Sequence, residues 1–167
     1  TLTSSLGTGR TALLIDGDKD GDGVYEHLDS YPGDSIRSIK CDAGQFGRYR
    51  CVDAPLGKFV PSSGSMYATD ASPGYFVSSA GQTSATACSP GYYQASSGQS
   101  SCDAADAGYY VSGTAQTSQT ACAAGTFSST TGLSSCTDAP AGYIVSYAGQ
   151  SSATACNAGY YQASSGQ

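Results

Sequence analysis

The sequence has little of what an enzyme or a nucleic-acid-binding protein needs. Among 167 residues there is no Trp, one Met and one His, and charged residues make up only 12%. The formal net charge is −6, and every Lys and Arg lies at or before Lys58, so no cationic stripe is present to neutralise phosphates. The single histidine, His27, has no spacing-matched nucleophile or acid. We therefore expect neither enzymatic activity nor a nucleic-acid partner.

Long apolar runs are also missing. No stretch approaches the roughly 20 residues of a membrane span, and the first residues do not have the pattern of a signal peptide. We expect any export signal, and further repeats, to lie outside this segment. Aliphatic residues are scarce and there are 22 glycines. Burial of apolar surface contributes only roughly 25 cal/mol per Å², so such a chain needs another constraint against its conformational entropy.

Seven cysteines can supply that constraint, as they do in small secreted domains. The last five lie at positions 88, 102, 122, 136 and 156, so short and long intervals alternate and together give a 34-residue period. The segment 74–99 matches 142–167, which lies two full periods further along the chain. Between Cys51 and Cys88 two long intervals follow each other, and the short one that should separate them is missing with both of its cysteines.

Each unit also carries a Gly followed within two residues by an aromatic residue. This pattern predicts a tight turn and then a short extended segment. Frequent Gly and Ser/Thr disfavour helix. The expected fold is a β-poor series of small disulfide-rich repeats, built from short β-hairpins and turns, that forms an elongated rod. The Gly/aromatic pairs are Gly57/Phe59, Gly74/Tyr75, Gly91/Tyr92, Gly108/Tyr109, Gly125/Phe127, Gly142/Tyr143 and Gly159/Tyr160.

The joint loss of two cysteines indicates that the cysteines of a short interval pair with each other. This hypothesis predicts the disulfides Cys41–Cys51, Cys88–Cys102 and Cys122–Cys136, and pairs Cys156 with a residue beyond the chain end. The alternative closes the long intervals, as Cys102–Cys122 and Cys136–Cys156, and leaves Cys41 over. Spacing alone does not decide between them. Zinc is not expected, because its cysteine ligands usually come in closer pairs.

The short interval follows the pattern C-x-x-G-x-[YF]-x-x-[ST]-[ST]-G-x-S-S-C. It resembles the ephrin-receptor-like cysteine-rich repeat, a relative of the tumour necrosis factor receptor modules, over residues 41–167. The resemblance implies an extracellular, elongated, β-poor rod with short-loop disulfides. The chain departs from that family in one respect: a long cysteine-free linker stands where the family has C-x-x-C between loops.

Residues 16–34 hold the densest cluster of carboxylates in the chain. Acidic residues recur at alternate positions around Gly23, which is the spacing of a twelve-residue calcium loop. Ca²⁺ takes 6–8 hard oxygen ligands, so a tightly curved backbone must present them in turn. The predicted ligands are Asp18, Asp20, Asp22, the carbonyl of Val24, Glu26 and Asp29, and a second ion would use Asp16 and Asp34.

Helices of an EF-hand are not expected around this loop, because Pro32 and Gly33 follow it directly. The pattern D-x-D-x-D-G followed by Pro and Asp instead resembles a thrombospondin type 3 repeat, with Glu26 in place of the usual Asp. The resemblance implies an irregular calcium-stabilised loop. A solvated acidic turn without an ion is the alternative interpretation of the same residues.

Three segments are therefore expected. Residues 1–15 would be the end of a preceding segment or a connecting strand, 16–40 the calcium-binding loop, and 41–167 the tandem repeats. We interpret the chain as an extracellular or cell-surface structural protein, a calcium-stabilised stalk or a filament subunit that associates with copies of itself. The alternative is the ectodomain of a receptor or adhesin that recognises a protein or glycan. Recurrent Ser/Thr clusters suit turns, and they would also accept O-linked glycans.

Overall fold

The computed structural model describes residues 2–6, 10–14, 40–48 and 50–166, and these residues contain sixteen β-strands and no helix. The strands form eight two-stranded antiparallel sheets, each made by strands that are consecutive in the chain. The first pairs β1 (Leu2–Leu6) with β2 (Arg10–Leu14). The expectation of small hairpins without helices is thus confirmed for the described residues.

The other seven hairpins consist of strands of two residues each. In chain order they are β3 (Gln45–Phe46) with β4 (Val52–Asp53), β5 (Lys58–Phe59) with β6 (Thr69–Asp70), β7 (Tyr75–Phe76) with β8 (Thr86–Ala87), β9 (Tyr92–Tyr93) with β10 (Asp103–Ala104), β11 (Tyr109–Tyr110) with β12 (Thr120–Ala121), β13 (Thr126–Phe127) with β14 (Thr137–Asp138), and β15 (Tyr143–Ile144) with β16 (Thr154–Ala155).

The structural unit is a 17-residue module, half of the 34-residue period of the cysteines. Each module begins with a Cys or an Ala, which is defined as its position 1. The first module is four residues shorter than the others. The modules are 1 (41–53), 2 (54–70), 3 (71–87), 4 (88–104), 5 (105–121), 6 (122–138), 7 (139–155) and 8 (from 156).

A tight turn opens every module and, in modules 1 to 7, directs the chain into its hairpin. In module 3 the amide of Tyr75 donates to the carbonyl of Ser72 at 3.0 Å, and Gly74 between them has a φ of +84°. This is the left-handed region, which Gly enters without steric cost. The carbonyl of Gly74 then accepts the amide of Cys88, the first residue of the next module, at 2.9 Å. The Gly-aromatic pattern therefore forms the turn and extended segment that the sequence predicts.

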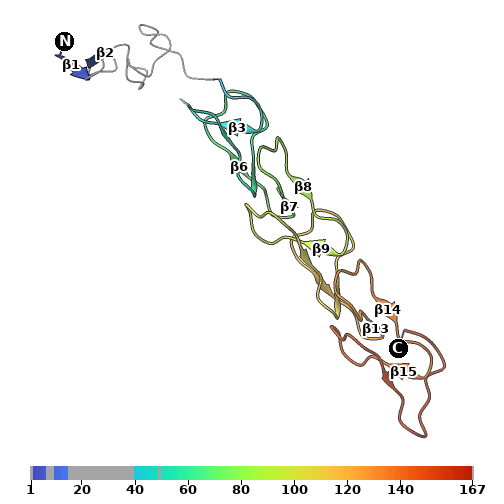
Figure 1. Cartoon of the computed structure of the whole chain (residues 1–167). Helices are drawn as coiled ribbons and strands as arrows, with labels where there is room; N and C mark the ends of the chain where they lie inside the picture. The colour runs from blue at the N-terminus through green and yellow to red at the C-terminus, as the bar shows by residue number, and fades with distance from the viewer. Residues whose placement is uncertain (1, 7–9, 15–39, 49, 167) are drawn as a thin grey trace.

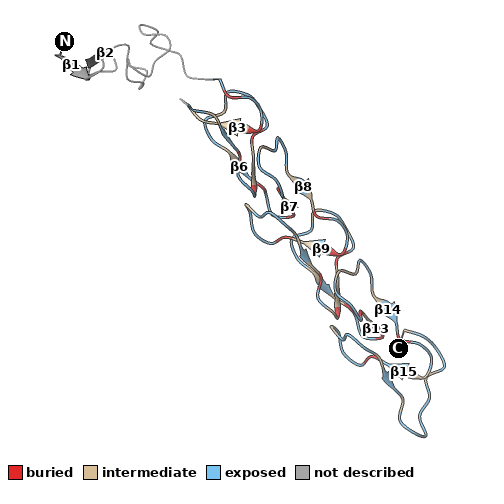
Figure 2. Cartoon of the chain, viewed as in Figure 1, coloured by how far each residue is buried: buried red, intermediate tan, exposed pale blue. Residues whose placement is uncertain are grey.

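The core is a narrow column built from three residues of each module. Positions 1, 4 and 7 are buried in modules 2 to 6, whereas most of the intervening residues are exposed. In module 2 these positions are Ala54, Gly57 and Val60. Figure 2 shows the buried residues as short segments that recur along the chain. Each module contributes so little apolar surface that its stability depends on its neighbours.

Besides the bond from the position 1 amide to the preceding position 4 carbonyl, adjacent modules are joined by the same three backbone hydrogen bonds. Between modules 4 and 5 the amide of Gly91 donates to Val111 O at 2.7 Å, and the amide of Gln94 donates to Gln116 O at 3.0 Å. The amide of Ala115 donates back to Cys88 O at 2.9 Å. The equivalent three bonds join every neighbouring pair from modules 1 and 2 to modules 6 and 7. Figure 1 shows the hairpins of these modules following one another in a row.

Modules two apart are also in direct contact. An ideal Cβ built on Gly91 of module 4 would collide with the backbone carbonyl of Gly132 in module 6. The glycine at position 4 stands in the same relation to position 11 of the second next module at Gly44, Gly57, Gly74 and Gly108. The contact therefore links each of these modules to the second next one, whether or not the modules contain a disulfide.

This close approach predicts unequal effects of two equivalent substitutions. Gly91 and Gly142 both have positive φ, +88° and +83°, but among the described residues only Gly91 faces another module, since none of them lies within 4 Å of an ideal Cβ on Gly142. Gly142→Ala should cost about 1–2 kcal/mol for the left-handed backbone. Gly91→Ala should cost a further 1–3 kcal/mol, roughly, because the contact is overpacked. Chemical denaturation of both variants measures the difference.

Gly113→Ala provides the control, because Gly113 does not have a positive φ and its Cβ would meet only the flexible side chain of Gln116. Its unfolding free energy should change least of the three. Equal losses for Gly91→Ala and Gly142→Ala would show that the contact between alternate modules contributes nothing to stability.

Candidate functional site

The predicted calcium ligands lie outside the described residues. These are Asp18, Asp20, Asp22, Val24, Glu26 and Asp29, together with Asp16 and Asp34 for a second ion. The calcium site therefore stays a prediction. In the part of the chain that the structure does describe, no three His, Cys, Asp or Glu side chains come together as metal ligands would. That same part has no helix with the length and apolarity to cross a membrane.

Three disulfides close the short cysteine intervals. They join Cys41 to Cys51, Cys88 to Cys102 and Cys122 to Cys136, with Cα–Cα distances of 5.3, 5.9 and 5.8 Å. Each disulfide lies within one module and joins position 1 to position 15, which in the shorter module 1 corresponds to Cys51. Cys156 occupies position 1 of module 8 and carries no disulfide in the structure. The disulfides thus close the modules and do not link one module to the next.

The disulfide and a buried valine replace each other as core residues. All four cysteine-free modules have Val at position 7, namely Val60, Val77, Val111 and Val145, and these are buried. The modules that contain a disulfide have Gly47, Gln94 and Ser128 at that position. Each of modules 1 to 7 therefore has either a disulfide or a valine at the centre of its core, and none of them has both.

Buried polar side chains in the disulfide modules are hydrogen-bonded within their own module. The side-chain nitrogen Nε2 of Gln94 donates to Ser101 O at 2.9 Å, and the side-chain oxygen Oε1 of Gln94 accepts from the backbone amide of Ser96 at 3.0 Å. The hydroxyl of Ser128, itself fully buried, donates to Thr130 O at 3.1 Å. Hydrogen bonds therefore compensate for the cost of burying these polar groups. Neither side chain indicates a functional site.

Two modules can stack directly without an intervening disulfide. Modules 2 and 3 both lack cysteine, yet Gly57 N donates to Val77 O at 2.9 Å and Gly81 N to Ala54 O at 2.8 Å, as at other junctions. The missing short cysteine interval between Cys51 and Cys88 therefore leaves no gap in the row. The module repeat continues through this region, and the cysteine-containing module that the alternation would place between modules 2 and 3 is absent as a whole.

Side chains at positions 5 and 17 pair across each hairpin, and in modules 1, 2, 4, 5 and 6 one or both of them lie over position 11 of the second next module. Tyr92 pairs with Ala104, and the Tyr92 hydroxyl lies 3.5 Å from an ideal Cβ on Gly132. In module 2 the pair is Lys58 and Asp70, whose charged atoms are 2.6 Å apart. Such exposed ion pairs contribute about 0–1 kcal/mol. The tyrosines at position 5 thus pack over a neighbouring turn, while part of each ring stays in solvent.

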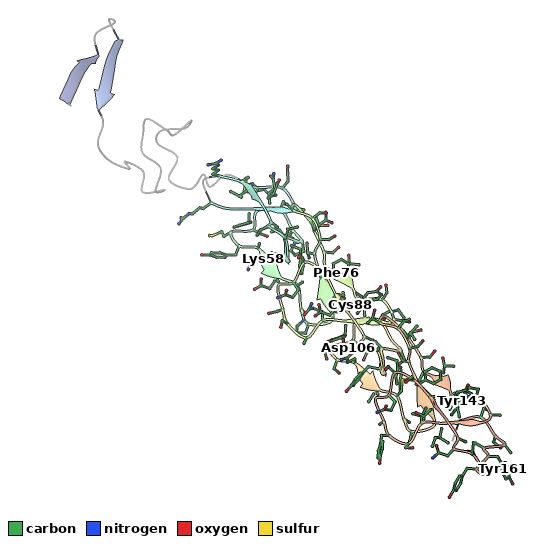
Figure 3. The ribbon with its side chains drawn as sticks, turned by 60° about the horizontal axis from the view of Figure 1, so that its bottom comes forward. Lys58, Phe76, Cys88, Asp106, Tyr143 and Tyr161 are labelled. Atoms are coloured by element: carbon green, nitrogen blue, oxygen red, sulfur yellow. A yellow bond between two sulfur atoms is a disulfide. The ribbon has the colours of Figure 1, made fainter. Side chains whose placement is uncertain are left out.

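Outward-facing tyrosines are the largest side chains on the row. Tyr75, Tyr92 and Tyr143 at position 5 are 38–43% exposed, and Tyr67 and Tyr147 are 80% and 75% exposed. Figure 3 labels Tyr143 on the row and Tyr161, which is 87% exposed, near its C-terminal end. The described surface from Phe59 to Gly166 also carries no Lys, Arg, His or Glu. It offers aromatic and hydroxyl groups but few groups that could transfer a proton near neutral pH.

The 17-residue module was not apparent from the cysteines, because cysteines mark only every second module from module 4 onward. A better signal was present in the sequence. Glycine recurs at every position 4 from Gly57 to Gly159, and valine follows it at position 7 in modules 2, 3, 5 and 7. The tyrosine that recurs at position 5 was part of the Gly-aromatic pattern, but its pairing with position 17 could not be predicted, because the residue type at position 17 alternates between Asp and Ala without a fixed order.

Comparisons with known proteins do not assign the chain to a family: no family model and no curated protein matches the sequence. The function must therefore be argued from the modules themselves.

The replacement of disulfide by valine can be tested in module 6. Cys122→Ala/Cys136→Ala should destabilise the chain by about 3 kcal/mol, by the loop-entropy estimate. Adding Ser128→Val to this variant, which gives module 6 the core of module 5, should recover about 1–2 kcal/mol by burial of the valine. Ser128→Val with the disulfide intact should be neutral or destabilising because the core is already filled.

Denaturant unfolding of the four proteins gives a double-mutant cycle. A coupling of at least about 1 kcal/mol between Ser128→Val and loss of the disulfide is expected. If the effects are additive, the disulfide and the valine do not share one place in the core.

Proposed function

We propose that this chain is a non-enzymatic extracellular structural protein, a rigid stalk or a subunit of a surface filament. The observation that carries the proposal is the uniform junction between modules. The same three backbone hydrogen bonds recur at each completely described junction, whatever the side chains are. A row in which each module bonds to its immediate neighbours, and touches the next beyond them, grows in one dimension and forms a rod.

The disulfides support a location outside the cytosol. Three disulfides in a chain with so small a core are typical of secreted proteins, because the reducing cytosol does not maintain such bonds. The ephrin-receptor-like resemblance of the cysteine repeat points to the same location. An extracellular site would also provide the calcium concentration that a weak acidic loop requires.

The acidic segment 16–34 is proposed to bind Ca²⁺ and to act as a rigid joint before the row. It holds seven carboxylates and only one lysine. Carboxylates this dense repel one another unless a cation lies between them. With calcium bound, the segment would transmit orientation from the preceding residues to module 1.

An ectodomain that binds a protein or glycan is the second candidate. It is favoured by the exposed aromatic side chains Tyr67 and Tyr147, which stand where other modules have small or polar residues. Aromatic side chains are enriched among residues that dominate binding energy. Most exposed loops are nevertheless alike from module to module, and this similarity favours a structural role over a single specific binding surface.

An elongated molecule is the first expected outcome. A compact chain of this length would have a radius of gyration of about 15 Å. The full chain should have a value of about 30 Å or more in small-angle X-ray scattering, because the modules are added along one direction. A value near that of a compact chain would contradict the rod.

Negative-stain microscopy of native material then separates the two candidate functions. Uniform fibres are expected for a filament subunit, whereas separate short rods that bind a ligand would favour the ectodomain.

Calcium binding is the second expected outcome. Titration calorimetry of the full chain should show a dissociation constant of about 10⁻³ M or tighter, the range of extracellular calcium modules. Asp20→Asn/Asp22→Asn should weaken binding at least tenfold, since it removes two of the predicted ligands.

Asp42→Asn is the matched control, because Asp42 is exposed in module 1 and lies outside the predicted loop. It should leave the titration unchanged. Absence of heat from the unmodified chain at millimolar calcium would rule out the calcium joint while leaving the rod untouched.

A further inference from the structure

Module 1 has a shorter loop than modules 2 to 7, and the residues that it omits are ones with which a module bonds to the module before it. Between position 7, Gly47, and position 15, Cys51, it has three residues where other modules have seven. The omitted residues include positions 11 and 12. In modules 2 to 7 the amide of position 11 donates to the preceding module, and the carbonyl of position 12 accepts a hydrogen bond from it. Module 1 therefore lacks two of the four main-chain groups with which a module bonds to the one before it.

Lys40 covers part of the face that this omission leaves. Its Cγ and Cε atoms lie 3.6 and 3.9 Å from an ideal Cβ on Gly64, at position 11 of module 2. The equivalent glycines of later modules are covered by side chains of the module two before, such as Tyr92 over Gly132. The aliphatic stem of Lys40 thus takes the place of a missing module and leaves the ammonium group exposed at the end of the row.

Two large apolar side chains lie on the same end face. Gly47 N donates to Ser65 O at 3.1 Å, so the short turn of module 1 lies beside residues 65–67 of module 2. Met66 and Tyr67 are 46% and 80% exposed. The corresponding positions of modules 3 to 7 hold only Ser or Thr, which makes Met66 and Tyr67 a departure from the repeat at solvent-exposed positions.

The turn itself adds cationic side chains to this face. Arg48 and Arg50 are exposed and flank residue 49 within the turn. Lys40, Arg48, Arg50, Met66 and Tyr67 therefore form one surface, here called the end patch. Four of the seven Lys and Arg residues of the chain lie between 40 and 58, and three of those four belong to the end patch.

We propose that the end patch is the docking surface for the chain's own acidic segment, residues 16–34. The charges are complementary, since this segment carries seven carboxylates and one lysine. It also contains the apolar residues Val24, Tyr25, Leu28 and Tyr31, which match Met66 and Tyr67. Only residues 35–39 separate Asp34 from Lys40, a span of at most about 20 Å, so the segment is held near the patch at high effective concentration.

A second copy of the chain is the competing occupant, because residues 59–167 carry four aspartates and no cation. The acidic segment is favoured because it has the higher density of negative charge and is covalently tethered. The docking goes beyond calcium binding and does not depend on it. It would fix the direction of the row relative to the residues that precede it.

Hydrogen exchange of the full chain tests the docking. Met66→Ser/Tyr67→Ser/Arg50→Glu restores the repeat residues at two positions and reverses one charge of the end patch. Amides in residues 16–34 should exchange at least threefold faster in this variant than in the unmodified chain, in the same calcium-containing buffer. Tyr147→Ser, which removes a similarly exposed tyrosine from module 7, should leave those rates unchanged.

Equal exchange rates in all three proteins would overturn the proposal. Carbodiimide coupling of Lys40 to carboxylates in an equal mixture of ¹⁴N- and ¹⁵N-labelled chains identifies the occupant. Cross-links from Lys40 to residues 16–34 within one chain support docking, and mixed-isotope cross-links in their place would assign the patch to a second copy. Calorimetry on the same variant separates the two proposals, because calcium should still bind when docking is lost.

Discussion

The backbone-to-backbone approach at the position 4 glycines is the constraint on which the rest of the structure depends. At Gly91, for example, the left-handed φ turns the chain into its hairpin. Because Gly91 has no side chain, the carbonyl of Gly132 can lie where a Cβ would otherwise be. The amide of the same glycine bonds the adjacent module. One residue without a Cβ therefore sets the turn, the junction and the contact between alternate modules. Side chains then vary freely around this framework.

Core composition follows from this framework. With backbones so close, each module has room for little more than one central apolar group, which is either the valine of position 7 or the disulfide from position 1. Because the junctions use main-chain atoms, the choice does not disturb neighbours. Modules 2 and 3 can consequently follow each other without cysteine, and modules 4 to 7 can alternate.

Much of the local structure could be predicted from the sequence, and less of the long-range structure. The glycine and the aromatic residue after it indicate a turn and a short strand, because few other conformations suit that pair. The joint absence of two cysteines indicated the short-loop pairing that the structure contains. The contact of Tyr92 with module 6 and the position of Lys40 over Gly64 could not be predicted, since both depend on the angle between modules, which no local pattern encodes. The calcium ligands lie outside the described residues and stay a prediction.

The intramodular position of the disulfides determines how the row would respond to a pulling force. A cysteine-free module can lengthen to about 60 Å when it is drawn out. In module 4 or 6 the disulfide joins positions 1 and 15, so the loop between them cannot be drawn out and the module can reach a length of only about 16 Å. Modules that can be extended and modules that can hardly be extended therefore alternate from module 4 to module 7. Modules 2 and 3, which both lack a disulfide, form a longer extensible stretch near the N-terminal end of the row.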